Sequence, residues 1–312
     1  MNDTLNVLLM SSRAEDVVSF LDHFAARDQL VEWLTQRPRD EPRVRVVDGD
    51  ASVATVVIPT ANSSGLLATR CVTEIFPGVK TILVEGKYGE DGHFNLPHNI
   101  NVGLSLAAKG PSPWIVIASD DMIRMDGVEV LVSGLNAVDS TKYDTLFTEP
   151  DGVYHSMWSK LGPPSLARRL YWSSNRFGRL ALAAERKFGV KVMDSFAKGW
   201  RALLGGRGYR HLSIASFGIV SRDFVRVSSG RPFNESFIAE AFDVELSLRL
   251  TRDPARYSFV RYRIGEDVGA TLGMGFRRRL TVVAANALLN HLIESDPSRY
   301  FRAGYDYTGL LR

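Results

Sequence analysis

One short apolar run that ends on two adjacent acids constrains the fold of this chain more than any other feature. Residues 114–118 (Trp-Ile-Val-Ile-Ala) are typical of a strand that is buried on both faces of a sheet. Ser119, Asp120 and Asp121 follow directly. Open α/β sheets bind ligands beyond the carboxyl ends of their strands, so the two acids indicate a metal and phosphate site. Alternatively, one of these polar side chains caps a helix that begins near Met122.

Two further apolar runs end at polar residues in the same way. Residues 53–59 precede Thr60 and Asn62, residues 80–85 end on Glu85, and a helical stretch separates the two runs. Strand, helix and strand at this spacing predict parallel strands joined by a right-handed crossover. We therefore expect an α/β fold of Rossmann-like architecture, with a mixed, mostly parallel central sheet flanked by helices. Its strand ends should bring these polar groups to one edge.

A nucleotide fits such an edge. The first loops would hold the base and ribose, and Asp120 and Asp121 would hold a diphosphate through a divalent cation. The sequence has no Gly-x-x-x-x-Gly-Lys-Ser/Thr loop, and no Gly-x-Gly-x-x-Gly opens a helix after a strand. The six histidines form no zinc-ligand pattern, and Cys71 is the single cysteine. The sequence thus favours phosphate binding through a metal ion held by Asp120 and Asp121, rather than through a glycine-rich loop.

Seven blocks along the chain together resemble a known enzyme family. They are residues 56–62, 82–85, 101–110, 115–121, 213–222, 231–237 and 243–250. In this order they resemble nucleotide-sugar glycosyltransferases of the GT-A fold, specifically the large inverting family 2. The resemblance covers residues 53–136 and 213–290. The most specific match is residues 243–250 (Asp-Val-Glu-Leu-Ser-Leu-Arg-Leu), which resemble the Glu-Asp-x-Asp-Leu-x-x-Arg helix of that family.

The resemblance implies transfer of a sugar, with inversion, from a nucleoside diphosphate sugar to an acceptor hydroxyl. It implies Mn²⁺ or Mg²⁺ on the segment Ser119-Asp120-Asp121, where the family has Asp-x-Asp. Asp121 is then the main metal ligand, Asp120 supports it, and Asp267 is a further candidate ligand. The nucleotide-binding residues that the resemblance implies are Pro59, Thr60, Asn62, Glu85, Asn101 and Asp120.

The second half of the resemblance implies the base and the acceptor site. Asp243 takes the position of the catalytic base, with Phe242 before it where the family has Glu. A base is required because the acceptor hydroxyl must lose its proton during the displacement. Alternatively, Asp243 caps a helix while Glu245 and Arg249 form an i, i+4 pair. We expect the acceptor to contact Phe217, Gly218, Glu235, Trp158 and Trp172.

Positive charge is concentrated in one segment. Residues 160–210 contain twelve Lys or Arg and two acids, a local charge of +10, so the rest of the chain carries −7 of the net +3. We expect a basic, helical insertion that contacts an anionic acceptor such as a glycan or glycolipid, or else a membrane surface or nucleic acid. Alternatively, this segment is a solvated insertion whose aromatic residues pack on the core.

These features predict a chain of five parts. An N-terminal extension (1–50), with a helix over residues 15–33 and a charged connector from Arg37 to Arg45, packs on the main domain. The other parts are a nucleotide-sugar-binding half (51–138), the basic insertion (139–212), an acceptor-binding half (213–275) and a C-terminal helical segment (276–312).

No apolar run reaches the about 18 residues of a membrane span, and no secretion signal is visible. We expect a cytoplasmic protein, peripheral at the membrane surface if the basic segment binds lipid. Two other functions stay open. One is a non-catalytic protein of the same fold that binds a sugar nucleotide or glycan, and the other is a nucleotidyltransferase.

Overall fold

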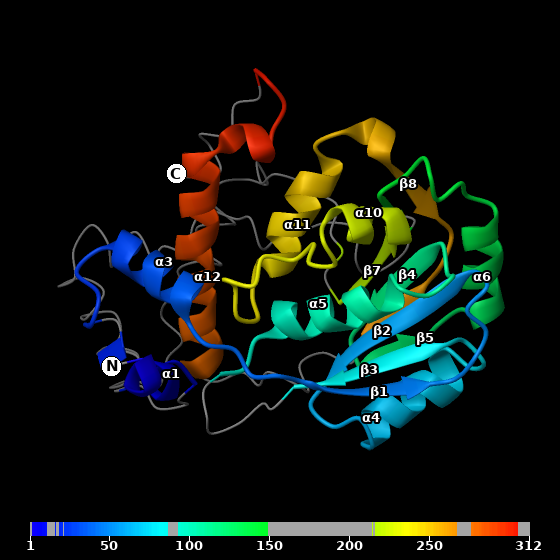
Figure 1. Ribbon diagram of the computed structural model, residues 1–312, viewed down its shortest axis with the longest axis horizontal. Helices are drawn as coiled ribbons and strands as arrows, with labels where there is room; N and C mark the ends of the chain where they lie inside the picture. Colours follow the sequence, from blue (N-terminus) through cyan, green and yellow to red (C-terminus); the bar gives the residue numbers. More distant parts are fainter. Residues whose placement is uncertain are drawn as a thin grey trace, which may run out of the picture.

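A seven-stranded sheet forms the centre of the computed structural model (Figure 1). The structure describes residues 2–10, 16, 19–20, 22–86, 93–148, 214, 216–266 and 276–304. The sheet has the order β1-β3-β2-β4-β7-β6-β8. Its strands are β1 (Arg43–Val47), β2 (Ala54–Thr60), β3 (Thr81–Glu85), β4 (Trp114–Ala118), β6 (Thr145–Thr148), β7 (Phe217–Ser221) and β8 (Tyr257–Val260).

The three apolar runs that the sequence singled out are the parallel core of this sheet. β2 pairs in parallel with β3 on one side and with β4 on the other. β6 and β8 run in the same direction, whereas β7, between β4 and β6, runs the opposite way, as does β1 at the edge. The predicted mixed, mostly parallel α/β sheet is thus confirmed.

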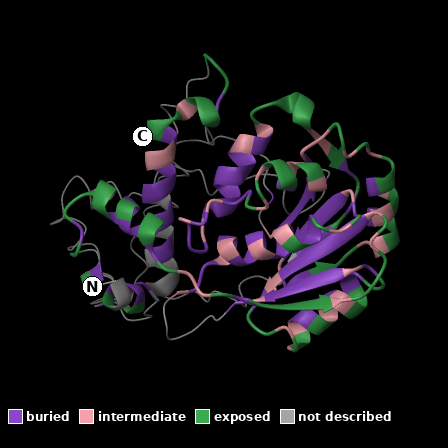
Figure 2. Ribbon diagram, in the orientation of Figure 1, coloured by how far each residue is buried: buried purple, intermediate pink, exposed green. Residues whose placement is uncertain are grey.

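Helices cover both faces of the sheet, which explains why its inner strands are buried at almost every position (Figure 2). On one face, Val57, Val84 and Ile117 belong to a cluster that also contains Ile100 and Leu104 of α5 (Leu96–Ala107). Gly103 of α5 allows close packing there, because an added Cβ would lie 2.4 Å from a methyl carbon of Val57. On the other face, the alternate strand residues pack against α4 (Leu66–Arg70), η1 (Cys71–Ile75) and α6 (Val128–Asn136).

The N-terminal region differs from its predicted organisation in two places. The predicted helix over residues 15–33 is interrupted by turns at residues 22–26, and α3 (Arg27–Gln36) begins after them. The last three residues of the predicted connector, 43–45, belong to the strand β1, which is antiparallel to β3. β1 alternates arginine and valine, as suits a strand at the edge of a sheet. Its backbone forms hydrogen bonds with backbone groups of β3 that would otherwise lack a partner strand.

The two ends of the chain pack together beside the sheet (Figure 1). The long helix α12 (Phe276–Ser295) contacts α1 (Asn2–Met10) and α3. The rings of Phe20, Phe24 and Trp33 lie 5.2–5.9 Å apart in this region. The N-terminal extension was predicted to pack on the main domain, whereas its helices α1 and α3 contact α12, which belongs to the predicted C-terminal helical segment.

The remaining described elements are short. They are β5 (Met122–Arg124), α10 (Arg222–Val227), α11 (Phe242–Thr251), η2 (Pro254–Arg256), β9 (Ile264–Glu266) and η3 (Pro297–Arg299). Among the helices that the structure describes, none combines the length and apolar character needed to cross a membrane. The basic segment 160–210, with Trp172, and the nearby Trp158 lie outside the described residues.

Candidate functional site at the strand ends

The carboxyl ends of β2, β3 and β4 meet through direct hydrogen bonds. Thr60, at the end of β2, is the register partner of Glu85 at the end of β3. The Thr60 hydroxyl donates to Oδ2 of Asp120, just beyond β4, at 2.6 Å. The backbone N–H of Gly86 donates to the Thr60 carbonyl at 3.1 Å. The predicted convergence of polar groups at this edge is therefore confirmed.

Asp120 and Asp121 lie in a tight connection between β4 and β5. Each is 5% exposed. The Ser119 hydroxyl lies 2.5 Å from Oδ1 of Asp121, and the Ser119 N–H donates to the Ser216 carbonyl at 2.8 Å. The Cys71 thiol donates to the Asp120 carbonyl at 3.3 Å. Burial raises the pKa of this thiol to about 12.

The alternative role of these acids as a helix cap is wrong. Met122 begins the strand β5, which pairs antiparallel with β9, and Met122 lies opposite Glu266. No helix begins after Asp121, because α6 starts at Val128 with Gly127 as its N-cap. The two buried carboxylates therefore do not serve a helix terminus.

Glu85 is held by the loop after β2. Its Oε2 accepts hydrogen bonds from the Ser63 hydroxyl at 2.6 Å and from the Ser63 N–H at 2.9 Å. The hydroxyl bond and then the backbone bond lower the pKa of Glu85, so its carboxylate stays ionised and can only accept hydrogen bonds. Asn62, which was predicted to bind nucleotide, bonds locally, with Oδ1 accepting the Ser64 N–H at 3.0 Å.

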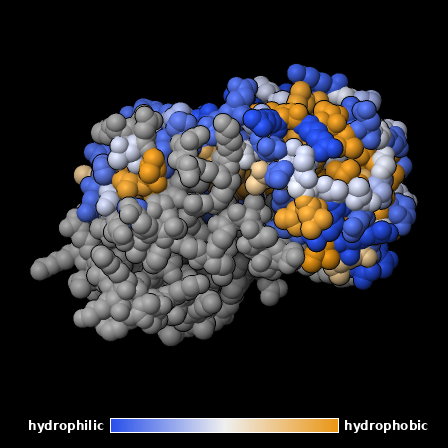
Figure 3. All heavy atoms as spheres, turned by 90° about the horizontal axis from the view of Figure 1, so that it is seen from below, coloured by the Kyte–Doolittle hydropathy of each residue, from blue (hydrophilic) through white to orange (hydrophobic). Residues whose placement is uncertain are grey.

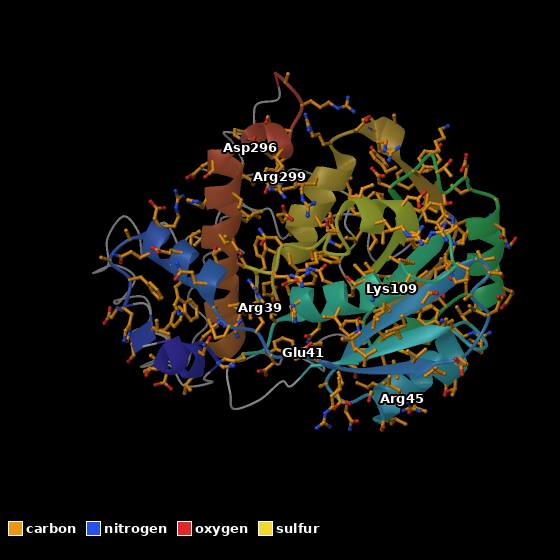
Figure 4. All side chains as sticks on the ribbon, in the orientation of Figure 1. Arg39, Glu41, Arg45, Lys109, Asp296 and Arg299 are labelled. Carbon is orange, nitrogen blue, oxygen red and sulfur yellow. The ribbon has the colours of Figure 1, made fainter. Side chains whose placement is uncertain are left out.

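Two residues near Glu85 were not predicted. Ser63 supplies both hydrogen bonds described above, and its place directly after Asn62 was the signal that could have revealed it. Arg45 on β1 donates to the Ser63 carbonyl at 3.0 Å and lies beside α4 (Figure 4). No sequence signal reveals Arg45, because β1 reaches this edge only through its pairing with β3.

A separate polar cluster contains Asn101 and Glu235. The Asn101 amide, buried on α5, donates to Oε1 of Glu235 and to the Phe233 carbonyl, each at 2.9 Å. The other carboxylate oxygen of Glu235 lies 3.1 Å from Nδ1 of His98 and 3.8 Å from Arg39 (Figure 4). Asn101, predicted to contact nucleotide, and Glu235, predicted to contact the acceptor, instead bind each other and join α5 to the turn of residues 231–237.

This cluster makes stability depend on pH. Burial raises the pKa of Glu235, but hydrogen bonds from His98 and Asn101 outweigh it and lower the pKa from 4.5 to about 2. A lowered pKa contributes stability that is present above the unfolded-state pKa and is lost as pH falls through the folded-state pKa.

We expect Glu235→Gln to lower the free energy of unfolding at pH 7 by up to about 3 kcal/mol, with the difference from the unsubstituted protein shrinking between pH 4.5 and 2. Urea unfolding at pH 7, 5, 4 and 3 measures this difference. A difference that stays constant over this range would contradict the role of the Glu235 charge.

Asp243 lies in the first turn of α11 and is 2% exposed. It is the second residue of the helix, and the N-cap position belongs to Ala241 with a φ of 59°. The alternative role of Asp243 as the N-cap is therefore wrong. A carboxylate in the first turn still gains from the partial positive charge at the helix N-terminus. Phe242, before it, contacts Phe233 with ring centroids 5.3 Å apart.

A buried ion pair anchors α11. The predicted Glu245–Arg249 pair is confirmed, and it is bidentate, with Nε to Oε1 at 2.8 Å and Nη2 to Oε2 at 2.9 Å. Glu245 is fully buried and also accepts the Tyr300 hydroxyl at 3.0 Å, while Arg249 donates to the Pro232 carbonyl. These bonds tie the helix that carries Asp243 to the turn before it and to the C-terminal segment.

Removal of one partner should show how much this anchor contributes. We expect Arg249→Ala to lower the free energy of unfolding by about 3–5 kcal/mol, because the fully buried Glu245 loses its bidentate partner and keeps only Arg299, at 3.9 Å, and the Tyr300 hydroxyl. Arg256→Ala is the matched control, since its pair with Asp144 is partly exposed and should contribute about 1 kcal/mol or less. Chemical denaturation measures both. Equal losses in the two variants would contradict this account.

Phe217 and Gly218 lie at the expected edge, but they face the core. Phe217 is the register partner of Ala118 at the end of β4. Its side chain is 3% exposed, and its ring lies 5.6 Å from that of Tyr262. A Cβ at Gly218 would lie 2.8 Å from the Cβ of Ile214, so Gly218 provides space for packing. The buried Phe217 ring and the close packing at Gly218 do not support the predicted contact with an acceptor.

The surface around the strand ends combines charged and apolar groups. Pro59, predicted to contact nucleotide, is partly exposed within β2 and pairs with Val84. Figure 3 shows hydrophobic patches among hydrophilic residues on the part of the molecule that contains the sheet. Leu66 at the start of α4 is 84% exposed, and Met125 directly after β5 is 51% exposed. Exposed apolar side chains therefore lie near the polar strand ends.

The donor atoms at this edge fit a small divalent cation. Asp120 and Asp121 offer hard carboxylate oxygens, and Mg²⁺ commonly binds through one or two carboxylates together with substrate phosphates and water. Within the described residues, no group of three or more His, Cys, Asp or Glu side chains forms a complete metal site. Asp267, the further candidate ligand, lies outside the described residues. Asp120 and Asp121 are thus the residues that would hold such an ion.

Comparison with known proteins adds no assignment. No protein-family model matches the chain, and no curated protein matches it either. The functional proposal therefore depends on the residues of the strand ends and on their contacts.

Proposed function

We propose that this chain is an inverting glycosyltransferase of GT-A type, which moves a sugar from a nucleoside diphosphate sugar to an acceptor hydroxyl. The observation that carries the proposal is the linkage of three strand ends. Thr60 pairs with Glu85 and bonds to Asp120, and Asp121 follows directly. An ionised carboxylate and two buried acids thus meet at the edge where α/β sheets bind nucleotides. The mixed sheet with its parallel core is compatible with this fold.

Different residues at this edge bind different parts of the nucleotide. Glu85, whose carboxylate stays ionised, accepts hydrogen bonds from N–H groups of the base, and Ser63 keeps it oriented. Pro59, Thr60 and Asn62 line the nucleoside side. Asp121, with Asp120, would hold Mg²⁺ or Mn²⁺ together with the diphosphate. When bound, this ion neutralises charge on the leaving diphosphate.

Asp243 is the proposed base. In an inverting transfer, the acceptor oxygen forms a bond to the anomeric carbon while the bond from that carbon to the diphosphate oxygen breaks. The acceptor proton passes to the carboxylate of Asp243. The Glu245–Arg249 pair supports this step, because it fixes the first turns of α11 from which Asp243 projects. The acceptor is expected to be anionic if the basic segment 160–210 contacts it.

One assay distinguishes this proposal from its alternatives. The protein is incubated with a panel of nucleotide sugars and Mn²⁺ or Mg²⁺, and the release of nucleoside diphosphate is measured. We expect slow, metal-dependent hydrolysis of a subset of donors, which requires no knowledge of the acceptor. Pyrophosphate release from a nucleoside triphosphate would instead favour a nucleotidyltransferase. Tight donor binding without turnover, also in the presence of candidate acceptors, would favour the non-catalytic binding protein.

A further inference from the structure

Each of the two acids at the strand ends has its own hydroxyl partner. The Ser119 hydroxyl lies 2.5 Å from Oδ1 of Asp121, and the Thr60 hydroxyl lies 2.6 Å from Oδ2 of Asp120. Distances in this range are typical of hydrogen bonds from a hydroxyl to an ionised carboxylate, which are stronger than those between neutral groups. One oxygen of each carboxylate is therefore held by a neighbouring hydroxyl.

Hydrogen bonds hold the backbone from which each hydroxyl projects. The Ser119 N–H donates to the Ser216 carbonyl at 2.8 Å. Thr60 is 6% exposed, its carbonyl accepts the Gly86 N–H, and its hydroxyl oxygen lies 3.2 Å from the Asn62 N–H. Thr60 is thus held both at its backbone and at its hydroxyl, whereas Ser119 is held at its backbone. The two hydroxyls set the orientation of the two acids.

We propose that Ser119 and Thr60 determine metal specificity, by keeping Asp121 and Asp120 as ligands that use one oxygen each. The proposal rests on the proposed function, which assigns the metal to these acids. Ca²⁺ takes about six to eight oxygen ligands and often binds both oxygens of a carboxylate, whereas Mg²⁺ requires near-octahedral geometry with single oxygens. Binding through both oxygens would weaken the hydroxyl bond to Asp121 or Asp120. The hydroxyls therefore favour Mg²⁺ and Mn²⁺ over Ca²⁺.

This role also explains why a serine functions at position 119. A third carboxylate there would add negative charge beside two acids that are already buried, each with 5% of its surface exposed. The serine hydroxyl instead donates to Asp121 and leaves the segment with two acidic side chains. Metal binding then relies on oriented oxygens and on the phosphates of the ligand.

The test measures metal preference rather than activity. Binding of Mn²⁺ alone to the full chain is followed by electron paramagnetic resonance, and the bound ion is displaced with Mg²⁺ or with Ca²⁺. Mg²⁺ should displace Mn²⁺ at lower concentration than Ca²⁺ does. We expect Ser119→Ala and Thr60→Val each to shift the ratio of the two competition constants toward Ca²⁺ by about tenfold, which corresponds to about 1.4 kcal/mol.

Two controls accompany the variants. Ser119→Thr keeps a hydroxyl and should keep the ratio of the unsubstituted protein. Ser52→Ala removes an exposed hydroxyl that donates to Asp50 at 2.9 Å, far along the chain from the acids, and should not change the ratio. Thr60→Val tests the same idea at a second site, so a folding defect in Ser119→Ala does not prevent the measurement.

The outcomes distinguish this inference from the proposed function. Absence of Mn²⁺ binding to the unsubstituted protein, both alone and with uridine or guanosine diphosphate, would overturn the metal site and the proposed function with it. Normal Mn²⁺ binding with an unchanged ratio in both Ser119→Ala and Thr60→Val would overturn only the role of the hydroxyls. An equal shift of the ratio in Ser52→Ala would also overturn the role of the hydroxyls.

Discussion

Asp243→Asn should bind nucleotide like the unsubstituted protein and lose sugar transfer by at least about 100-fold. A general base typically contributes a factor of about 10²–10⁴ to a rate, and the amide of asparagine cannot accept the acceptor proton. Donor binding should not change, because the residues proposed to hold the nucleotide are on β2, β3 and the connection after β4. Single-turnover transfer and nucleotide titration measure the two properties separately.

Asp223→Asn is a matched control for this prediction. Asp223 is the second residue of α10, as Asp243 is of α11, but its side chain is 58% exposed. This variant should transfer sugar normally. A thermal unfolding scan of Asp243→Asn separates loss of the base from loss of the fold. Normal transfer by a folded Asp243→Asn protein would remove Asp243 from the mechanism.

Asp121→Ala should lower metal-dependent nucleotide affinity by at least about tenfold. Even a residue that only orients a metal ligand typically contributes about 10- to 100-fold to metal affinity, and Asp121 is proposed as a direct ligand. Titration calorimetry with uridine or guanosine diphosphate measures the effect in the presence of Mn²⁺. The difference from the unsubstituted protein should disappear when a chelator removes the metal, because Asp121 is proposed to bind the phosphates only through the ion.

Asp139→Asn is the control for a general loss of negative charge. Asp139 is exposed, and its carboxylate accepts the Thr141 hydroxyl at 2.8 Å, much as Asp121 accepts the Ser119 hydroxyl. Its substitution should leave the metal-dependent affinity unchanged. Unchanged affinity of Asp121→Ala in Mn²⁺ would defeat the assignment of Asp121 as a metal ligand.

The strands at the site were predictable because their signal is local. Residues 53–59, 80–85 and 114–118 are rich in β-branched side chains, and a strand with two covered faces requires apolar residues at every position. Their order along the chain, with a helix between the first two, also predicts parallel pairing. The edge strand β1 was missed because none of its residues is buried, so its sequence carries charged residues like those of a loop.

The roles of individual polar residues were less predictable. Asn101 and Glu235 bind each other across 134 positions of sequence, and nothing local to either residue indicates the other. The choice between a helix cap and a strand after Asp121 depended on pairing between Met122 and Glu266. Phe217 was placed at the right edge, but the packing of its ring on Tyr262 determined where its side chain points.

The sequence by itself determined the run of residues 114–118, the two acids beyond it and the parallel core to which they belong. These properties follow from local side-chain character and spacing, which strand formation and burial require directly. Only the tertiary structure decided that Thr60 holds Asp120 and that Ser119 holds Asp121. It also showed that Asp243 lies within the first turn of α11 rather than capping it. The physical reason is that these contacts depend on backbone placement by distant parts of the chain, including β3, β7 and β9.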